Sequence, residues 1–388
     1  MRKESSLRPG RAGLLPSLLL VPLIIVLSSI HVGAAGGILP ISRARLVVDS
    51  TVNRADLPRC LCPGGPSQRN LLGLERPTPH ALGKRALADP VTLRILAIRV
   101  EFPYEESDDP LTTGRGRFDL RDTTIFFDSA GHSFDTSPHN RRYFAAHLRA
   151  LNAYWNVVSN GRLSLESHVF PVAEDSAYRV PQPTGFYGRE RDGDSGLVFG
   201  LRQFIEDAAN AAAADPAIRF ADYDGVIIFH AGTSRQFDVL NDSPHDLFSV
   251  FIRRDDPVIL NGGADTLGEA ILVPETISQD GRIGVLNGVL AHEFGHQLGL
   301  VDLYNTFNFT TQVGNFSLMD NNANDVGIET EVEGQRRILF GAVPVFPDAW
   351  SRAYLGFVDV LTVTDSTPVT VWTAEEEELA PFNRQVWR

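Results

Sequence analysis

At Val289-Leu-Ala-His-Glu-Phe-Gly-His-Gln-Leu-Gly-Leu-Val-Asp-Leu-Tyr304 the sequence places two histidines four residues apart, with a glutamate directly after the first. Apolar residues surround them, which predicts a buried helix rather than a loop. On a helix, His292 and His296 lie one turn apart on the same face, so both imidazoles can reach one tetrahedral zinc ion. Glu293 can then act as general base toward a zinc-activated water molecule and deliver the proton to the leaving amine.

The residues after the histidine pair favour a metal site. Gly299 follows His296 by three residues, where a residue that tolerates positive φ can end the helix and turn the chain back. Asp302 comes three residues later with a carboxylate that can complete the ligand set. A buried helix with an ordinary histidine pair is the alternative, but it does not require these two further residues. The sequence therefore predicts zinc ligands at His292, His296 and Asp302.

A methionine lies downstream, in Gly314-Asn-Phe-Ser-Leu-Met-Asp320. Met319 and the initiator Met1 are the two methionines of the chain. The metzincin proteases place a polarizable methionine beneath their zinc ligands, in the Met-turn. Taken alone, Met319 is more typical of a core residue. Its place after the histidine motif is what favours a Met-turn.

The N-terminal segment has the pattern of an export signal. Basic residues precede an apolar run over 14–30, and the small residues Val32-Gly33-Ala34 follow it, as at a signal-peptide cleavage site. The run contains two prolines and is shorter than the roughly 20 residues of a membrane-spanning helix. We expect residues 1–34 to be a signal peptide, the protein to be secreted, and no stable membrane anchor to remain after cleavage.

Composition narrows the classes of function. The 388 residues include 35 Lys and Arg against 48 Asp and Glu, and the net charge of -13 repels phosphate backbones and anionic membranes. We therefore expect no nucleic-acid partner. The two cysteines, Cys60 and Cys62, cannot form a disulfide framework, so stability has to come from a buried core.

Strands and helices alternate after position 90. Hydrophobic patterns predict strands at 91–102, 163–170 and 225–230, and helices at 140–158 and 197–214. This alternation predicts a mixed α/β or α+β domain. Residues 35–90 show no sustained period and are interpreted as a propeptide or disordered lead-in. We assign 91–360 to the catalytic domain and 361–388 to the start of a β-type C-terminal region.

Together these features resemble the M6 family of secreted bacterial metalloproteases, of the immune inhibitor A type. The resemblance covers 91–360 and rests on the zinc motif, Ser317-Leu-Met-Asp320, Pro347-Asp-Ala-Trp-Ser-Arg-Ala-Tyr-Leu-Gly-Phe357, Leu93–Phe102 and Tyr154–Gly161. It implies a metzincin-like fold, in which a central twisted sheet is combined with an active-site helix. It also implies a zinc endopeptidase with the three ligands and the catalytic glutamate given above.

The chain departs from this family in two respects. Family members continue into further β-rich domains, whereas this chain reaches Arg388 soon after a strand-like stretch at 368–372, so we expect a fragment or a short member. The family's calcium loop is reduced to Phe220-Ala-Asp-Tyr-Asp224. Asp320-Asn-Asn-Ala-Asn-Asp325 offers oxygen ligands for Ca²⁺, but an Asn-rich turn explains it equally well. A structural calcium ion is therefore left open.

The predicted function is hydrolysis of protein or peptide substrates by a secreted, monomeric zinc endopeptidase. We expect Gly268–Pro274 to be a cleft-edge strand that pairs with the substrate backbone. Two alternatives remain: a non-catalytic surface or adhesion protein stabilised by zinc, and a zinc amidohydrolase acting on cell-wall amides.

The two cysteines suggest a form of latency. A thiolate of Cys60 or Cys62, in the predicted propeptide, could fill the open zinc position of a precursor. A labile adjacent pair, or pairing with another chain, is the competing interpretation.

Overall fold

The computed structural model describes residues 90–121, 135–189, 194–305, 310–321, 327–332, 334–362 and 384–387. The predicted signal peptide, the predicted propeptide up to residue 89, Cys60 and Cys62 lie outside these residues. So do the stretch 368–372 and residues 322–325 of the Asn-rich segment. Within the described ranges, no helix combines the length and the hydropathy needed to cross a bilayer.

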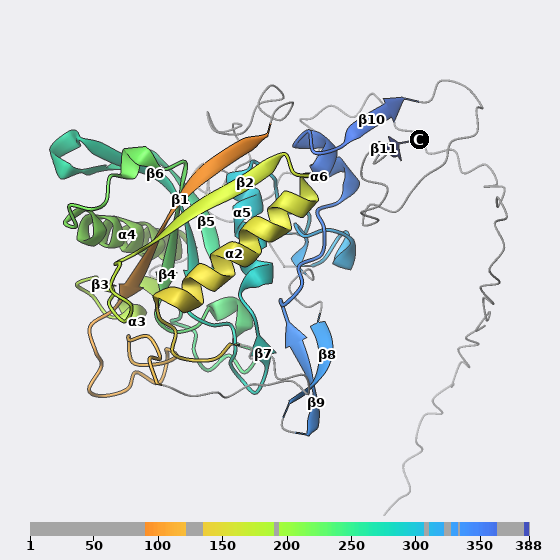
Figure 1. Cartoon of the computed structure of the whole chain (residues 1–388). Helices are drawn as coiled ribbons and strands as arrows, with labels where there is room; N and C mark the ends of the chain where they lie inside the picture. The colour runs from red at the N-terminus through yellow and green to blue at the C-terminus, as the bar shows by residue number, and fades with distance from the viewer. Residues whose placement is uncertain are drawn as a thin grey trace, which may run out of the picture. The chain divides into compact units, whose positions relative to one another are not determined.

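A central sheet organises the fold (Figure 1). Its strands are β1 (Val91–Glu101), β2 (Leu163–Phe170), β3 (Tyr178–Arg179), β4 (Gly225–His230), β5 (Val250–Leu260) and β6 (Asp265–Pro274). The order is β2-β1-β4-β6-β5, and β3 pairs with the end of β1. The pairings among β1, β2, β3, β4 and β6 are parallel, whereas β5 runs antiparallel to β6. The central strands are buried on both faces and mostly apolar, as expected for parallel strands covered on each side, although β1 also buries Arg99.

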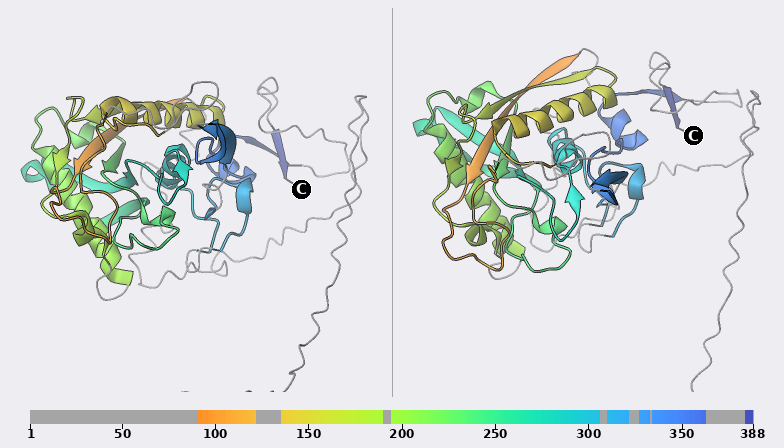
Figure 2. Two further views of the ribbon diagram at one scale, coloured as in Figure 1. Left: turned by 90° about the horizontal axis from the view of Figure 1, so that it is seen from below. Right: turned by 60° about the horizontal axis from the view of Figure 1, so that its bottom comes forward.

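Helices cover the two faces of this sheet (Figure 2). The helices of the described residues are α2 (Arg141–Val158), α3 (Thr184–Gly188), α4 (Asp194–Ala213), α5 (Asn287–Gln297) and α6 (Ala349–Tyr354), and those packed on the strands of this sheet are α2, α4 and α5. On β5, the Phe251 ring lies against the His296 ring of α5. The Arg254 side chain, in contrast, donates a hydrogen bond to the Arg202 carbonyl of α4. Because side chains at odd and even positions of a strand point to opposite faces, α5 and α4 lie on opposite sides of the sheet.

Smaller elements complete the described chain. A second sheet has the order β7-β9-β8, formed by β7 (Ile283–Gly284), β8 (Gly327–Val332) and β9 (Gln335–Phe340). The strands β10 (Asp359–Thr362) and β11 (Arg384–Trp387) form a parallel pair. Short 3-10 turns lie at Phe220–Asp222, Arg235–Phe237, Asn261–Gly263 and Gly314–Phe316.

The sequence prediction of a mixed α/β or α+β domain is confirmed, and so are the predicted strands and helices, to within a few residues. One prediction is wrong: Gly268–Pro274 is not an edge strand, because β6 lies between β4 and β5. The stretch Ala270–Pro274 is buried throughout, as an internal strand requires. The edge position belongs to β5, which carries charged side chains such as Arg253 and Arg254.

Candidate metal centre

The helix α5 is held in the core along its whole length. All residues from Gly288 to Gln297 are buried. Its Phe294 ring packs against Trp155 of α2, with ring centroids 6.0 Å apart. At its N-terminal end, the side chain of Asn287 contacts Nδ1 of His147, also on α2, at 2.9 Å. Because both ends of the helix contact α2, the side chains of α5 are carried on a rigid element.

The chain reverses directly after this helix. Gly299 has φ of 99°, a conformation that suits glycine. Its N–H donates to the carbonyl of His296 at 2.9 Å, and the next N–H, of Leu300, donates to the carbonyl of Gly295 at 3.0 Å. These two bonds form a Schellman motif. The helix thus ends just before Gly299, and the turn brings Asp302 back toward the helix.

The three predicted ligands converge. Asp302 Oδ1 lies 3.2 Å from Nε2 of His292 and 3.3 Å from Nε2 of His296. The two imidazole rings are nearly perpendicular, with centroids 4.9 Å apart. One ligand atom from each of the three side chains lies within 4.8 Å of the other two. This spacing allows a single cation to contact all three.

Backbone carbonyls determine the tautomer of both histidines. Nδ1 of His292 donates to the carbonyl of Leu318 at 2.8 Å, and Nδ1 of His296 donates to the carbonyl of Leu300 at 3.0 Å. A carbonyl oxygen can only accept, so each Nδ1 carries a hydrogen. In the neutral imidazoles, the lone pair is therefore on Nε2, the atom that faces Asp302. Metal-binding histidines are held in this way.

The donor set fits zinc. The side chain of Asp302 is almost fully buried, yet its second oxygen, Oδ2, has no hydrogen-bond partner among the described residues. A buried carboxylate oxygen without a donor is costly unless a cation compensates it. Two imidazoles and one carboxylate form a three-ligand set that leaves a fourth tetrahedral position open, as in catalytic zinc sites.

The charges of the three side chains are strongly coupled. Burial opposes ionisation of Asp302, but the two imidazoles outweigh it and hold the pKa of Asp302 below its usual range. Burial likewise lowers the pKa of His296, but the Asp302 charge outweighs it and raises that pKa to about 9. The site therefore attracts positive charge.

Glu293 is buried beside the ligands. Burial raises the pKa of its carboxyl, while the two histidines and the backbone N–H of Phe251 on β5 act in the opposite direction. A glutamate with a raised pKa can better exchange protons near neutral pH. The contact with Phe251 also places the edge strand β5 next to the predicted general base.

Met319 packs directly against α5. The side chain is fully buried, and its Sδ would lie 2.7 Å from a Cβ placed on Gly295. Gly295 stands between the two histidines in the sequence, so the sulfur lies against the helix between the ligand positions. The backbone also participates, because the Met319 carbonyl accepts the N–H of Leu303, next to Asp302, at 2.8 Å.

The acidic segments considered for calcium bind other groups of the protein, although Asp320 Oδ1 is buried without a hydrogen-bond partner among the described residues. Asp320 Oδ2 accepts the N–H groups of the loop residues 312–314. Asp224 accepts the N–H of Arg94 at 2.8 Å, which attaches its turn to β1. Asp238, Asp242 and Asp280 also lie close together. Asp238 and Asp280 accept backbone N–H groups of the loop 239–243. The structure leaves the question of calcium where the sequence left it.

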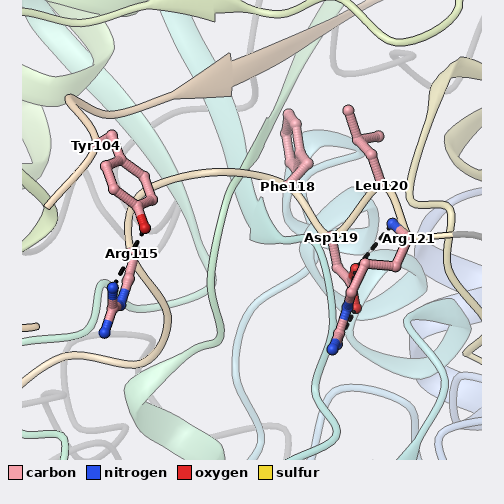
Figure 3. Close-up of a pocket in the computed structure, with 6 residues that line it drawn as sticks. All are labelled: Tyr104, Arg115, Phe118, Asp119, Leu120 and Arg121. Carbon is pink, nitrogen blue, oxygen red and sulfur yellow. Dashed lines mark hydrogen bonds and ion pairs between the residues drawn. The ribbon is translucent and has the colours of Figure 1, made fainter. Parts of the chain in front are cut away.

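A surface pocket of about 730 Å³ lies in the loop that follows β1 (Figure 3). Its lining residues are Tyr104, Arg115, Phe118, Asp119, Leu120 and Arg121. Both arginines already contact lining side chains, Arg121 with Asp119 at 2.8 Å and Arg115 with the Tyr104 hydroxyl at 3.2 Å. None of the predicted metal ligands lines this pocket.

Three supporting groups were not predicted from the sequence: the Leu318 carbonyl, the Leu300 carbonyl and the Phe251 N–H. All three belong to the backbone, so no residue type signals them. One residue elsewhere does carry a side-chain signal. Asp348 directly precedes the helix α6, and an aspartate in that position is typical of an N-cap.

Searched against protein-family models and against curated proteins, the chain matches neither a family model nor a curated protein. The resemblance to the M6 family therefore rests on short motifs, and the function has to be argued from the residues and their geometry.

Proposed function

We propose that this protein is a secreted, metzincin-like zinc endopeptidase that hydrolyses peptide bonds in protein substrates. The observation that carries the proposal is the convergence of two Nε2 atoms and one carboxylate oxygen, from His292, His296 and Asp302. Each imidazole is held by a backbone carbonyl in the tautomer that zinc binding needs.

The chemistry divides between the metal and the chain. A zinc ion, when bound, supplies polarisation of the scissile carbonyl and acidification of a water molecule. The three ligand side chains hold the cation. The Glu293 carboxylate accepts a proton from the water molecule and then donates it to the nitrogen of the leaving amine. The raised pKa of Glu293 supports this role, because the carboxyl has to be protonated and deprotonated in each cycle.

The position of β5 supports a peptide as substrate. This strand lies at the edge of the central sheet. Its Phe251 contacts Glu293 through the backbone and lies beside the His296 ring. Gln236 binds the backbone of Ser249, so an extended peptide would pair with β5 beyond this residue by β-augmentation and would run past the general base. Main-chain pairing of this kind tolerates many substrate sequences.

The test of the proposal is the variant Glu293→Gln, which keeps the shape of the side chain and removes its ability to accept a proton. We expect casein hydrolysis to fall by about 10²- to 10⁴-fold, the usual loss on removing a general base. Zinc content should stay at one ion per chain. The matched control is Glu329→Gln on the exposed hairpin strand β8, which should hydrolyse casein like the parent protein.

Three results would count against the proposal. Unchanged hydrolysis in Glu293→Gln would remove the mechanism. A parent protein that binds zinc but digests neither casein nor peptidoglycan would favour the non-catalytic alternative. Digestion of peptidoglycan alone would favour the amidohydrolase.

Export and processing belong to the same proposal and rest on the sequence of residues 1–90. The N-terminus of the active form, determined by Edman degradation or mass spectrometry, should lie after Ala34, and near Val91 if the propeptide is removed. A precursor that is activated normally after Cys60→Ser and Cys62→Ser would exclude latency through these thiols.

A further inference from the structure

The short segment 317–319 contacts the candidate metal centre on two sides. The Leu318 carbonyl accepts Nδ1 of His292 at 2.8 Å. The Met319 carbonyl accepts the N–H of Leu303, the residue after Asp302, at 2.8 Å. A shift of this segment would therefore move the partner of one ligand and the backbone next to another. Whatever holds the segment in place also sets the orientation of two ligands.

The Ser317 hydroxyl is a main support of this segment. It donates to Asp348 Oδ2 at 2.9 Å and accepts the N–H of Met319 at 3.2 Å and of Asp348 at 3.3 Å. One donor and two acceptor positions are the full capacity of a hydroxyl. Ser317 is fully buried, so water does not replace these bonds if they are lost. A second support is the N–H of Leu318, which donates to the Phe346 carbonyl at 3.1 Å.

Asp348 is itself fixed by the start of α6. Its Oδ1 accepts the N–H of Ser351 at 3.0 Å, which makes it the N-cap of that helix. Its Oδ2 accepts the Ser351 hydroxyl at 2.6 Å in addition to the Ser317 hydroxyl. A hydrogen bond to a carboxylate is roughly twice as strong as one between neutral groups. Ser317 is thus tied to a rigid acceptor 31 residues away in the sequence.

We infer that Ser317 and Asp348 are positioning residues of the metal centre. Their hydrogen bond holds the Leu318 carbonyl where it orients the imidazole of His292, and so keeps the ligand set arranged for a cation. Neither residue touches the cation or the substrate in this role. The inference rests on the proposed metal-binding function. It extends that function by one further layer of residues, from the ligands to the groups that hold the ligands' partners.

A purely structural role is the competing explanation, since the same bond also attaches α6 to the core. Ser351 separates the two explanations. Its hydroxyl binds the same carboxylate oxygen as Ser317 does, but among the described residues it makes no hydrogen bond to the segment 317–319. Loss of the Ser351 hydroxyl weakens the start of α6 and leaves the bond between Ser317 and Asp348 in place.

The experiment compares three variants of the full chain: Ser317→Ala, Asp348→Asn and Ser351→Ala. Asp348→Asn retains one oxygen for the helix cap and loses the acceptor of the Ser317 hydroxyl. Zinc affinity is measured by competition with a chromophoric chelator. The visible spectrum of the Co²⁺-substituted protein reports the ligand geometry, and thermal unfolding of the metal-free forms reports the fold.

We expect Ser317→Ala and Asp348→Asn to bind zinc about 10- to 100-fold more weakly, the usual cost of removing a group that supports a ligand. Their Co²⁺ spectra should differ from that of the parent protein. Ser351→Ala should keep the parent affinity and spectrum, even if all three metal-free forms lose similar thermal stability. If Ser317→Ala does not fold, Asp348→Asn alone decides the question, because its helix cap is retained.

Two outcomes would overturn the inference: parent-like zinc affinity in Ser317→Ala and Asp348→Asn, or an equal loss of affinity in Ser351→Ala. Both presuppose that the parent protein binds zinc. A parent protein that binds no zinc would instead refute the proposed function, so the two failures are distinguishable.

Discussion

Two clusters among the described residues bury histidine against carboxylate, and they differ in where their polar atoms point. In the candidate metal centre, His292 and His296 direct Nε2 toward Asp302 at 3.2 and 3.3 Å. Asp302 retains an oxygen without a hydrogen-bond donor among the described residues. The polar atoms of this cluster converge on one point and are not satisfied by the protein alone.

The second cluster joins Glu275, directly after β6, to Asp135 and His139 in the segment before α2. Glu275 accepts Nδ1 of His139 at 2.9 Å and two backbone N–H groups at 2.8 and 2.9 Å. Asp135 accepts two side-chain hydroxyls at 2.8 and 3.0 Å. Nε2 of His139 is 3.9 Å from the nearer oxygen of Asp135. The carboxylates here are occupied by protein donors from several segments, so the cluster connects loops.

This difference shows that residue type alone does not define a metal site. Both clusters combine buried imidazole with buried carboxylate, but only the first brings one ligand atom from each of its three side chains within 4.8 Å of the others. What separates them is whether the carboxylate oxygens already have donors.

The largest effect is expected for His296→Ala, which removes one of three ligands. Zinc affinity should fall by more than the roughly 10- to 100-fold that loss of a supporting group costs. In the parent protein, free zinc at 100 times its Kd should stabilise the fold by about 2.7 kcal/mol. That stabilisation should vanish in the variant. His139→Gln, in the second cluster, should bind zinc and be stabilised by it like the parent. Stoichiometric zinc in His296→Ala would contradict the ligand assignment.

A smaller effect is expected for Gly295→Ala. A Cβ at this position would lie 2.7 Å from Met319 Sδ, inside any normal contact distance. Overpacking of this kind costs about 1–3 kcal/mol, and the better helix propensity of alanine recovers about 1 kcal/mol of it. The free energy of unfolding from urea titration is the measurement. Gly268→Ala is the control, since its Cβ would meet nothing within 4 Å. Equal stability of the two variants would disprove close packing of Met319 on α5.

The smallest effect concerns the pH dependence of the second cluster. Burial lowers the pKa of His139, but the hydrogen bond and charge of Glu275, with the charges of Asp135 and Asp119, outweigh it and raise the pKa above 6.5. A raised pKa in the folded state means that the stabilisation is complete below the unfolded pKa and is lost as pH rises through the folded pKa. The stability of the zinc-loaded protein should therefore decline above about pH 6.5.

His139→Gln provides the comparison for this decline. The variant should be less stable at low pH and should approach the parent as the pH rises. Thermal unfolding between pH 6 and 9, together with the NMR titration of the His139 imidazole, measures both effects. Parallel stability curves for the two proteins would show that His139 does not titrate in this range.

Much of the fold and of the candidate site follows from the sequence because the signals are local. The periodicity of α2 is evident from adjacent positions: the helix was predicted at 140–158 and runs over Arg141–Val158, with Asn140 as its N-cap. The same holds for β4, whose bounds at Gly225 and His230 match the apolar run. The position of β6 was missed, because an apolar run indicates a buried strand without indicating which strands lie beside it.

The sequence by itself determined the helix that carries His292 and His296, the glycine turn after it and the aspartate beyond. Helical period and positive φ are properties of neighbouring residues. Only the tertiary structure decided that β5 is the edge strand beside Glu293. It also decided that Leu318 holds His292 and that Ser317 reaches Asp348. These contacts join residues that are far apart in the sequence, so they depend on the path of the whole chain. Many of them are made by backbone groups, which are the same at every position and therefore give no sequence signal.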